Sequence, residues 1–163
     1  MTLNPALEHI SGLIGTWKGS GHGIYPTIRD FDYADEWEFR DIGKPFLWFI
    51  ERTRIGENAA HIETGYLRFP QAATPQTPGT VELVAAIPTG QSELAEGTCT
   101  ILPGGAIEIR VAGEVRNTST AKEVLRMERV FRLSGDSLDY EMEMEAVGQP
   151  LSNHLRATLT RTD

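Results

Sequence analysis

The stretch that decides the fold reads GTWKGSGHGIYPTI and covers residues 15–28. Four of its first nine residues are glycines, and a proline comes near its end. Glycine weakens an isolated strand, and proline cannot donate a ladder hydrogen bond. Glycine is nevertheless needed where a strand bends sharply or another backbone comes close. We therefore interpret the stretch as the first strand of a curved β-barrel, with Trp17 as an aromatic plug at the closed end.

Short segments bounded by glycine or proline make up the rest of the chain. FDYADEWEF (31–39) is typical, because it places Phe31, Tyr33, Asp35, Trp37 and Phe39 on one face. Similar segments cover 44–54, 61–69, 80–87, 92–102, 106–115, 123–133, 138–147 and 154–162. About ten strands without helix-length crossovers predict an antiparallel, meandering sheet. The pattern favours a closed barrel over a packed β-sandwich, and leaves the sandwich open.

Only one helix is expected, over residues 5–14, with Asn4 as its N-cap and Pro5 at its first position. No linker or internal repeat divides the chain. The predicted fold class is therefore all-β. It consists of a single domain over 1–163, an antiparallel barrel of roughly ten strands shaped like a lipocalin or fatty-acid-binding protein, with a short N-terminal helix.

Composition narrows the classes of partner and the compartment. The net charge is −8 and the 15 cations form no cluster, which argues against nucleic acid and against an anionic membrane surface. The single cysteine, Cys99, excludes an internal disulfide and is expected to be a small buried hydrophobe. We expect a cytoplasmic protein. The sequence leaves open whether it works as a monomer or a homodimer.

The strand YEMEME (140–145) indicates what the barrel encloses. Tyr140, Met142 and Met144 share one face, and three glutamates share the other. Methionine adapts to irregular apolar surroundings, so the first face is expected to line a core or a ligand cavity. A barrel of about ten strands is wider than the eight-stranded kind that side chains just fill. We therefore expect an internal pocket.

Four histidines are the remaining candidates for chemistry. His9 is expected to face solvent, His22 lies in the glycine-rich stretch, and His61 and His154 each open a strand. No pair has the spacing of a zinc site. Read from the residues alone, each is either structural or a ligand, and a single histidine suffices as the proximal ligand of a haem.

A family resemblance favours the haem. GTWKGSGHGIYPTI resembles the Gly-x-Trp-x-Gly-x-Gly plus Tyr-Pro-Thr signature of the nitrobindin family, which are haem-binding β-barrels. FDYADEWEFRDIGKPFLWFIERTR (31–54), HIETGYLR (61–68) and AVGQPLSNHL (146–155) resemble its later hallmarks in the same order. Together these segments span nearly the whole chain.

The resemblance implies roles for particular residues. His154 would bind the iron of one haem b per chain, and Thr27 would touch the haem. His61 and Met144 would line the cavity. The haem propionates need cations or water. Lys122, Arg126 and Arg129 are the candidate cations, and Lys122 is favoured among them.

Strand alternation conflicts with this role for His154. Leu155, Ala157 and Leu159 share the apolar face, so regular alternation points His154 the other way. Either a bulge near Asn153 or a partly polar inner face would resolve the conflict.

The resemblance implies a ferric haem protein that binds nitric oxide or peroxynitrite and isomerises peroxynitrite to nitrate. Two alternatives stay open. One is a non-catalytic nitric oxide carrier or sensor that uses the same haem. The other is a haem-free binder of fatty acids or other small apolar ligands, which would usually need a buried arginine or tyrosine to receive a carboxylate.

Overall fold

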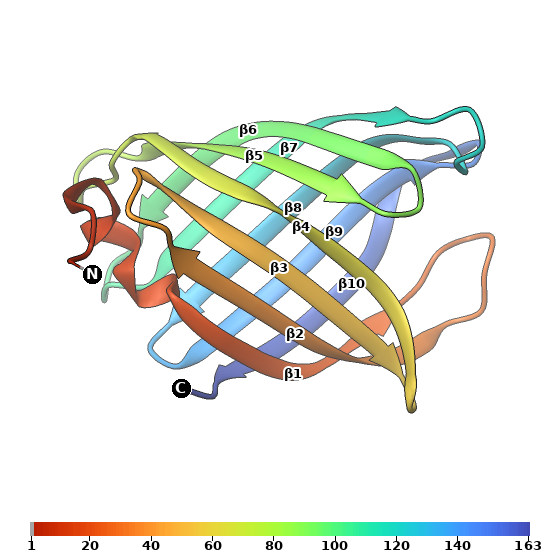
Figure 1. Ribbon diagram of the computed structural model, residues 1–163, viewed down its shortest axis with the longest axis horizontal. Helices are drawn as coiled ribbons and strands as arrows, with labels where there is room; N and C mark the ends of the chain where they lie inside the picture. Colours follow the sequence, from red (N-terminus) through yellow and green to blue (C-terminus); the bar gives the residue numbers. More distant parts are fainter. Residues whose placement is uncertain (1) are drawn as a thin grey trace.

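A computed structural model describes residues 2–163 and shows a closed, ten-stranded antiparallel β-barrel (Figure 1). Each strand pairs with its sequence neighbours, and β1 also pairs with β10, which closes the barrel. One 3₁₀ helix, η1, spans Pro5–Leu13. The strands are β1 (Gly15–Gly23), β2 (Phe31–Asp41), β3 (Phe46–Ile55), β4 (Asn58–Gln71), β5 (Gly79–Ile87), β6 (Gln91–Ile101), β7 (Ile107–Asn117), β8 (Val124–Ser134), β9 (Ser137–Ala146) and β10 (Gln149–Arg161).

The barrel predicted from the sequence is confirmed, and the sandwich is excluded because the sheet closes on itself. The N-terminal helix is also confirmed, with the Asn4 side chain accepting a hydrogen bond from the backbone N–H of Ala6. The largest differences from the expected bounds are at β4 and β10, which begin three and five residues earlier than predicted. The segment 24–30, expected in part as strand, is instead the long connection between β1 and β2.

Helix η1 covers one end of the barrel, where both chain termini also lie (Figure 1). Trp17 is fully buried there, and its indole N–H donates to the carbonyl of Leu13 at 2.9 Å. The Arg161 guanidinium lies 4.4 Å from the centre of the Trp17 ring. The predicted aromatic plug is therefore confirmed. The expectation that His9 faces solvent is wrong, because its ring packs edge-on against Phe69 and both ring nitrogens are buried.

The glycines of β1 make room for neighbouring groups. A side chain at Gly19 would collide with the backbone of β10, since a Cβ there would lie 2.0 Å from the Thr158 oxygen. At Gly21 the collision would be with the Tyr33 ring, at 2.3 Å. At Gly23 it would be with the Phe31 ring, at 2.2 Å. Only the first case is the close backbone approach predicted from the sequence. At Gly21 and Gly23 the missing side chain instead leaves room for aromatic rings of β2.

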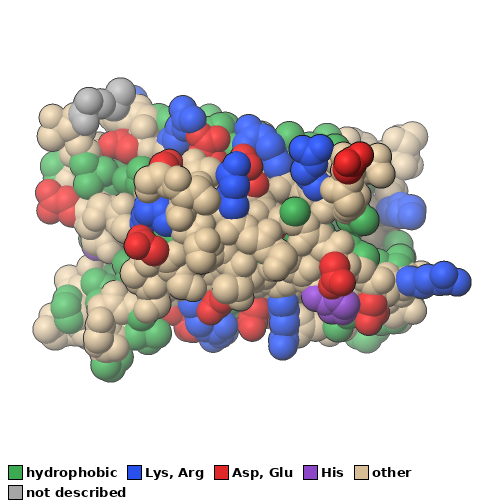
Figure 2. All heavy atoms as spheres, turned by 90° about the horizontal axis from the view of Figure 1, so that it is seen from below, with side chains coloured by type: hydrophobic (Ala, Val, Ile, Leu, Met, Phe, Trp, Pro, Cys, Tyr) green, Lys and Arg blue, Asp and Glu red, His purple; other side chains and the backbone are tan. Residues whose placement is uncertain are grey.

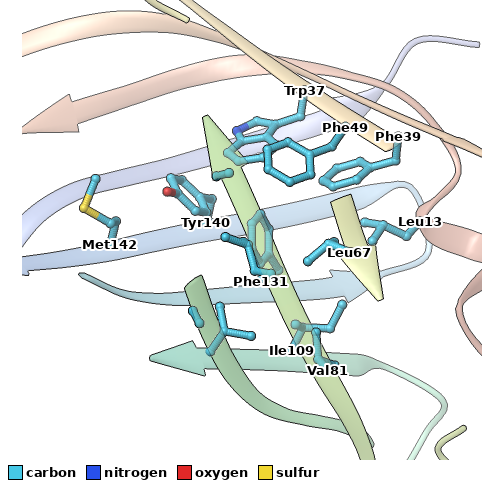
Figure 3. Close-up of a cluster of buried hydrophobic side chains, with 14 of the residues drawn as sticks. Leu13, Trp37, Phe39, Phe49, Leu67, Val81, Ile109, Phe131, Tyr140 and Met142 are labelled. Atoms are coloured by element: carbon cyan, nitrogen blue, oxygen red, sulfur yellow. The ribbon is translucent and has the colours of Figure 1, made fainter. Parts of the chain in front are cut away.

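The half of the barrel next to η1 is packed with aromatic side chains (Figure 3). The Trp37 ring stacks on Phe39 with centroids 5.5 Å apart and meets Phe131 edge-on at 5.2 Å. Burial of large aromatic rings is a major favourable contribution to folding. This packing fixes the closed end, so any internal space has to lie toward the opposite end.

The outer surface carries basic and acidic side chains next to one another (Figure 2). Several form ion pairs between neighbouring strands, such as Lys18 with Glu36 at 3.0 Å and Arg132 with Glu108 at 2.8 Å. Exposed pairs of this kind contribute little stability each. Within residues 2–163, no helix is long and apolar enough to cross a membrane.

Candidate functional site

A cavity of about 300 Å³ opens at the end of the barrel opposite η1. Its walls come from eight strands, β2–β6 and β8–β10, and are mostly apolar, with a few polar groups. The lining side chains on β2, β3 and β4 include Phe31, Tyr33, Thr53, His61 and Glu63; those on β8, β9 and β10 include Met127, Met142, Met144, His154 and Leu155. The internal pocket predicted from the sequence is therefore present.

His154 reaches this cavity because β10 contains a bulge. Asn153 pairs with Glu143 and Leu155 pairs with Met142, so His154 is the extra residue between two consecutive pairs. A bulge leaves one residue unpaired and locally resets which side chains face inward. Both His154 and Leu155 consequently line the cavity. The conflict with strand alternation is resolved by the first of the two solutions expected, a bulge next to Asn153.

The imidazole of His154 is held in one orientation and one tautomer. Its Nδ1 lies 2.9 Å from the carbonyl oxygen of Ile24, and a carbonyl can only accept. Nδ1 therefore carries the proton, and Nε2 keeps its lone pair. Burial lowers the pKa of His154, against a smaller opposite effect of the bond to Ile24, so the ring is neutral near pH 7. A neutral imidazole whose second nitrogen bonds to a carbonyl is the usual state of a metal-ligating histidine.

Tyr25 ties the β1–β2 connection to the mouth of the barrel. Its hydroxyl accepts from the backbone N–H of Ala146 at 2.9 Å and lies 3.1 Å from the carbonyl of Met144. The Tyr25 ring packs edge-on against His154 at 5.4 Å. The backbone N–H of Ile24 also donates to the carbonyl of His154 at 2.8 Å. The connection therefore supports the His154 ring from both backbone and side chain.

Three of the five predicted site residues line one cavity. His61 and Met144 do so together with His154. Thr27 lies exposed in the β1–β2 connection, and Lys122 lies exposed in the loop before β8. The backbone carbonyl of Lys122 accepts from the side chain of Gln91, a cavity residue, at 2.9 Å, so Lys122 is close to the mouth.

The two further candidates for the propionates differ from each other. Arg126 is partly exposed and pairs with Glu128 at 2.8 Å. Arg129 is completely buried, and its guanidinium bonds to Glu63, Glu93 and Tyr140. It is therefore not free to hold a propionate.

Arg129 belongs to a layer of buried charged groups between the aromatic half and the cavity. Glu63 and Glu93 share its guanidinium. Burial alone would raise the pKa of Glu63, but Arg129 and a hydrogen bond with His61 outweigh it and lower that pKa to about 2. Glu63 is accordingly ionised at neutral pH.

Asp35 and Glu51 form the other part of the layer, and no basic side chain among residues 2–163 pairs with them. Burial raises the pKa of Asp35 to about 7. Burial and the charges of Glu63 and Asp35 raise the pKa of Glu51 well above its usual value. The pair therefore holds at least one proton at neutral pH.

This charged layer was missed in the sequence, although a signal for it exists. Every second residue of a strand faces inward, and Glu51 continues the inward series of Leu47 and Phe49 in β3. Arg129 likewise stands between the inward-facing Met127 and Phe131 in β8. A charged residue on an otherwise apolar face is unusual enough to predict a buried ion pair. The partners could not be named, because they lie on different strands.

The sequence of this barrel also matches the profile of a known family. The sequence profile of the THAP4-like, heme-binding beta-barrel domain matches residues 6–161. The chain belongs to this family. The THAP4-like assignment agrees with the nitrobindin resemblance read from the sequence.

Relatives of the THAP4-like domain match over nearly the full length. A protein of Nocardia farcinica named peroxynitrite isomerase is 45% identical, with 99% of this chain and 94% of the relative covered. Peroxynitrite isomerase 2 of Mycobacterium avium is 46% identical, with 98% and 96% covered. The crystal structure of Rv2717c from Mycobacterium tuberculosis superposes with a TM-score of 0.91 at 43% identity, covering 99% of this chain and 100% of that one.

The residues present fit a haem. The His154 Nε2 lone pair has no protein partner among the described hydrogen bonds, and the walls next to it are methionine, leucine and phenylalanine side chains. Haem iron takes a neutral imidazole nitrogen, and the macrocycle needs apolar walls. Both requirements are met in this one cavity.

Proposed function

We propose that this protein binds one haem b per chain through His154 and isomerises peroxynitrite to nitrate. The observation that carries the proposal is the bulge at His154, which turns a neutral imidazole with a free Nε2 into an apolar cavity. Full-length similarity to proteins named peroxynitrite isomerase supports the reaction. When bound, ferric haem supplies an iron position at which a small ligand such as nitric oxide or peroxynitrite is held.

The protein's own part is to hold and shield the cofactor. The Ile24 carbonyl fixes the tautomer of His154 and makes its Nε2 a better donor to iron. Met127, Met142 and Leu155 bury apolar surface. His61 and Met144 line the same cavity, and in this proposal they contact the haem or its ligand. Thr27 and Lys122 stay predictions: the first would contact the haem at the mouth, and the second would pair with a propionate.

One structural observation disfavours the haem-free lipid carrier. Such a protein usually needs a buried arginine or tyrosine to receive a fatty-acid carboxylate. The buried Arg129 is already bonded to two carboxylates, Glu63 and Glu93. A third carboxylate would meet a region that is already negative. Arg129 is therefore not available to receive a fatty acid, which leaves the buried, unpaired hydroxyl of Tyr33 as the tyrosine of the cavity that could do so.

The test is a titration of the haem-free protein with ferric haem, followed by the Soret band. Wild type should saturate at one haem per chain, and His154→Ala should lose the histidine-ligated spectrum and regain it with added imidazole. His22→Ala is the matched control, because His22 is exposed on β1. If His154→Ala and wild type give the same spectrum, His154 is not the ligand.

Catalysis is tested separately by stopped-flow decay of peroxynitrite, with the nitrate yield measured at the end. The wild-type holoprotein should speed the decay and raise the nitrate yield, and the haem-free protein should do neither. A holoprotein that binds nitric oxide but leaves peroxynitrite decay unchanged would instead be a carrier or sensor.

A further inference from the structure

Four carboxylates and one guanidinium are buried together beneath the cavity. Asp35, Glu51, Glu63 and Glu93 are each at most 3% exposed, and Arg129 is 0% exposed. Arg129 offsets one carboxylate charge, and the Asp35–Glu51 pair holds at least one proton. Buried charges without a partner are costly. The layer therefore has room for further positive charge, carried either by protons or by a cation.

Three side chains of the cavity floor are placed to share one ion. A carboxylate oxygen of Glu51, a ring nitrogen of His61 and a carboxylate oxygen of Glu63 all lie within 4.8 Å of one another. Two ligands that each bind one metal at about 2.1 Å can be at most about 4.2 Å apart. Small side-chain rotations therefore bring the three groups to ligand distance. They come from adjacent strands, because Glu51 pairs with Glu63 across β3 and β4.

Buried oxygens that are short of hydrogen-bond partners at this place are an independent indication. Glu51 is only 1% exposed, and neither its Oε1 nor Oδ1 of Asp35 accepts from another donor of the described residues; the two carboxyls hydrogen-bond to each other through a proton that the pair holds. The hydroxyl of Tyr33 is buried and unpaired. Buried polar atoms are nearly always paired, so each exception requires an explanation. A bound ion next to Glu51 would satisfy the carboxylate that has no cation of its own.

The remaining bonds of the layer are compatible with an ion. His61 Nε2 and Glu63 Oε2 are 3.2 Å apart, and a metal would replace this hydrogen bond while sharing the Glu63 carboxylate with Arg129, which bonds to both of its oxygens. Arg129 keeps its bonds to Glu93. A divalent ion at Glu51 would displace the proton that the Asp35–Glu51 pair holds, because a carboxyl group binds a metal in its deprotonated form. His61 and Glu63 line the open cavity, so an ion can enter from solvent.

We propose that Glu51, His61 and Glu63 form a second metal site on the floor of the cavity, which binds one divalent first-row transition-metal ion such as Zn²⁺. One imidazole and two carboxylates suit Zn²⁺, Mn²⁺ or Fe²⁺ better than Mg²⁺ or Ca²⁺, which prefer oxygen ligands alone. The site does not rest on the haem function, because none of its three ligands is the haem ligand His154.

The experiment uses the full chain without haem. Co²⁺ is titrated and followed by its visible d–d absorption, and Zn²⁺ binding is measured by calorimetry. Wild type should bind one ion per chain. Glu51→Gln, which changes neither size nor shape, should weaken binding at least about tenfold, since losing even a supporting residue of a metal site has that effect. His61→Gln is the second variant, because His61 is only partly buried and its loss removes the one nitrogen ligand of the proposed site.

Three control variants separate this site from others. Glu141→Gln changes a glutamate on the outer face of β9 and should leave binding unchanged. His22→Ala removes an exposed histidine that pairs with Asp30 and Asp32, the other place where a metal could bind on the surface. His154→Ala should lose haem but keep Co²⁺, so failure of the haem proposal and failure of the metal site give different results.

The proposal is overturned if wild type binds neither ion, or if Glu51→Gln and His61→Gln both bind as tightly as wild type. It is equally overturned if His22→Ala or His154→Ala abolishes binding. Thermal unfolding of each variant shows whether a loss of binding reflects a loss of folding. A variant that melts like wild type and binds no ion supports the site.

Discussion

Replacing Arg129 is predicted to lower the stability of the fold strongly. Arg129 is completely buried, and its guanidinium donates to Glu63, Glu93 and the hydroxyl of Tyr140. In Arg129→Met the aliphatic length is kept but both carboxylates lose their counter-charge. Removing one partner of a buried ion pair costs about 3–5 kcal/mol. For a chain of this size about 1 kcal/mol corresponds to about 2–4 °C, so the melting temperature should fall by about 6–20 °C.

The measurement is urea unfolding at pH 7 together with calorimetry. Arg68→Met is the matched control, because Arg68 pairs with Glu82 on the exposed surface, and it should cost less than about 1 kcal/mol. A triple variant that adds Glu63→Gln and Glu93→Gln to Arg129→Met should recover much of the loss, because no unpaired charge remains.

The stabilisation that Arg129 gives through Glu63 should depend on pH. The folded pKa of Glu63 is about 2, below its ordinary value of 4.5, so its ionisation stabilises the fold above pH 4.5. This contribution is lost as the pH falls through 4.5 toward 2. Arg129→Met lacks the contribution at every pH, so its difference from wild type should narrow over that range. A cost below about 1 kcal/mol at pH 7, or a triple variant no more stable than the single one, would refute the reasoning.

Two further predictions concern the mouth and the closed end. Tyr25→Phe leaves the Ala146 N–H without its partner, which should lower the free energy of unfolding by about 1–3 kcal/mol. The same change loosens the support of His154, so haem should transfer faster to an acceptor protein. An unchanged transfer rate would contradict this role of Tyr25. Burial lowers the pKa of His9 below 6.5, so stability is full above pH 6.5 and falls as the pH drops further. His9→Phe keeps the contact with Phe69 and should flatten the decline of melting temperature between pH 7 and 5; the same slope in both proteins would show that His9 is not responsible.

The sequence predicted most of the fold because the signals it needs are local. Alternation along each strand separates the inner from the outer face, and glycine and proline mark the turns. The predicted strand ends were less accurate. In β10, for example, the bulge at His154 interrupts the inward–outward alternation of the first residues, so the start of the strand was placed too late. The site was predicted in part through family resemblance, and His154, His61 and Met144 do share one cavity.

By itself, the sequence determined an all-β chain whose inward faces carry both aromatic residues and methionines. Only the tertiary structure decided that His154 turns inward, because a bulge depends on pairing with β9. Only the tertiary structure, too, brought Glu51, Glu63, Glu93 and Arg129 into one buried layer. These residues come from four different strands, and a charge–charge contact between strands leaves no trace in the local pattern of any one of them.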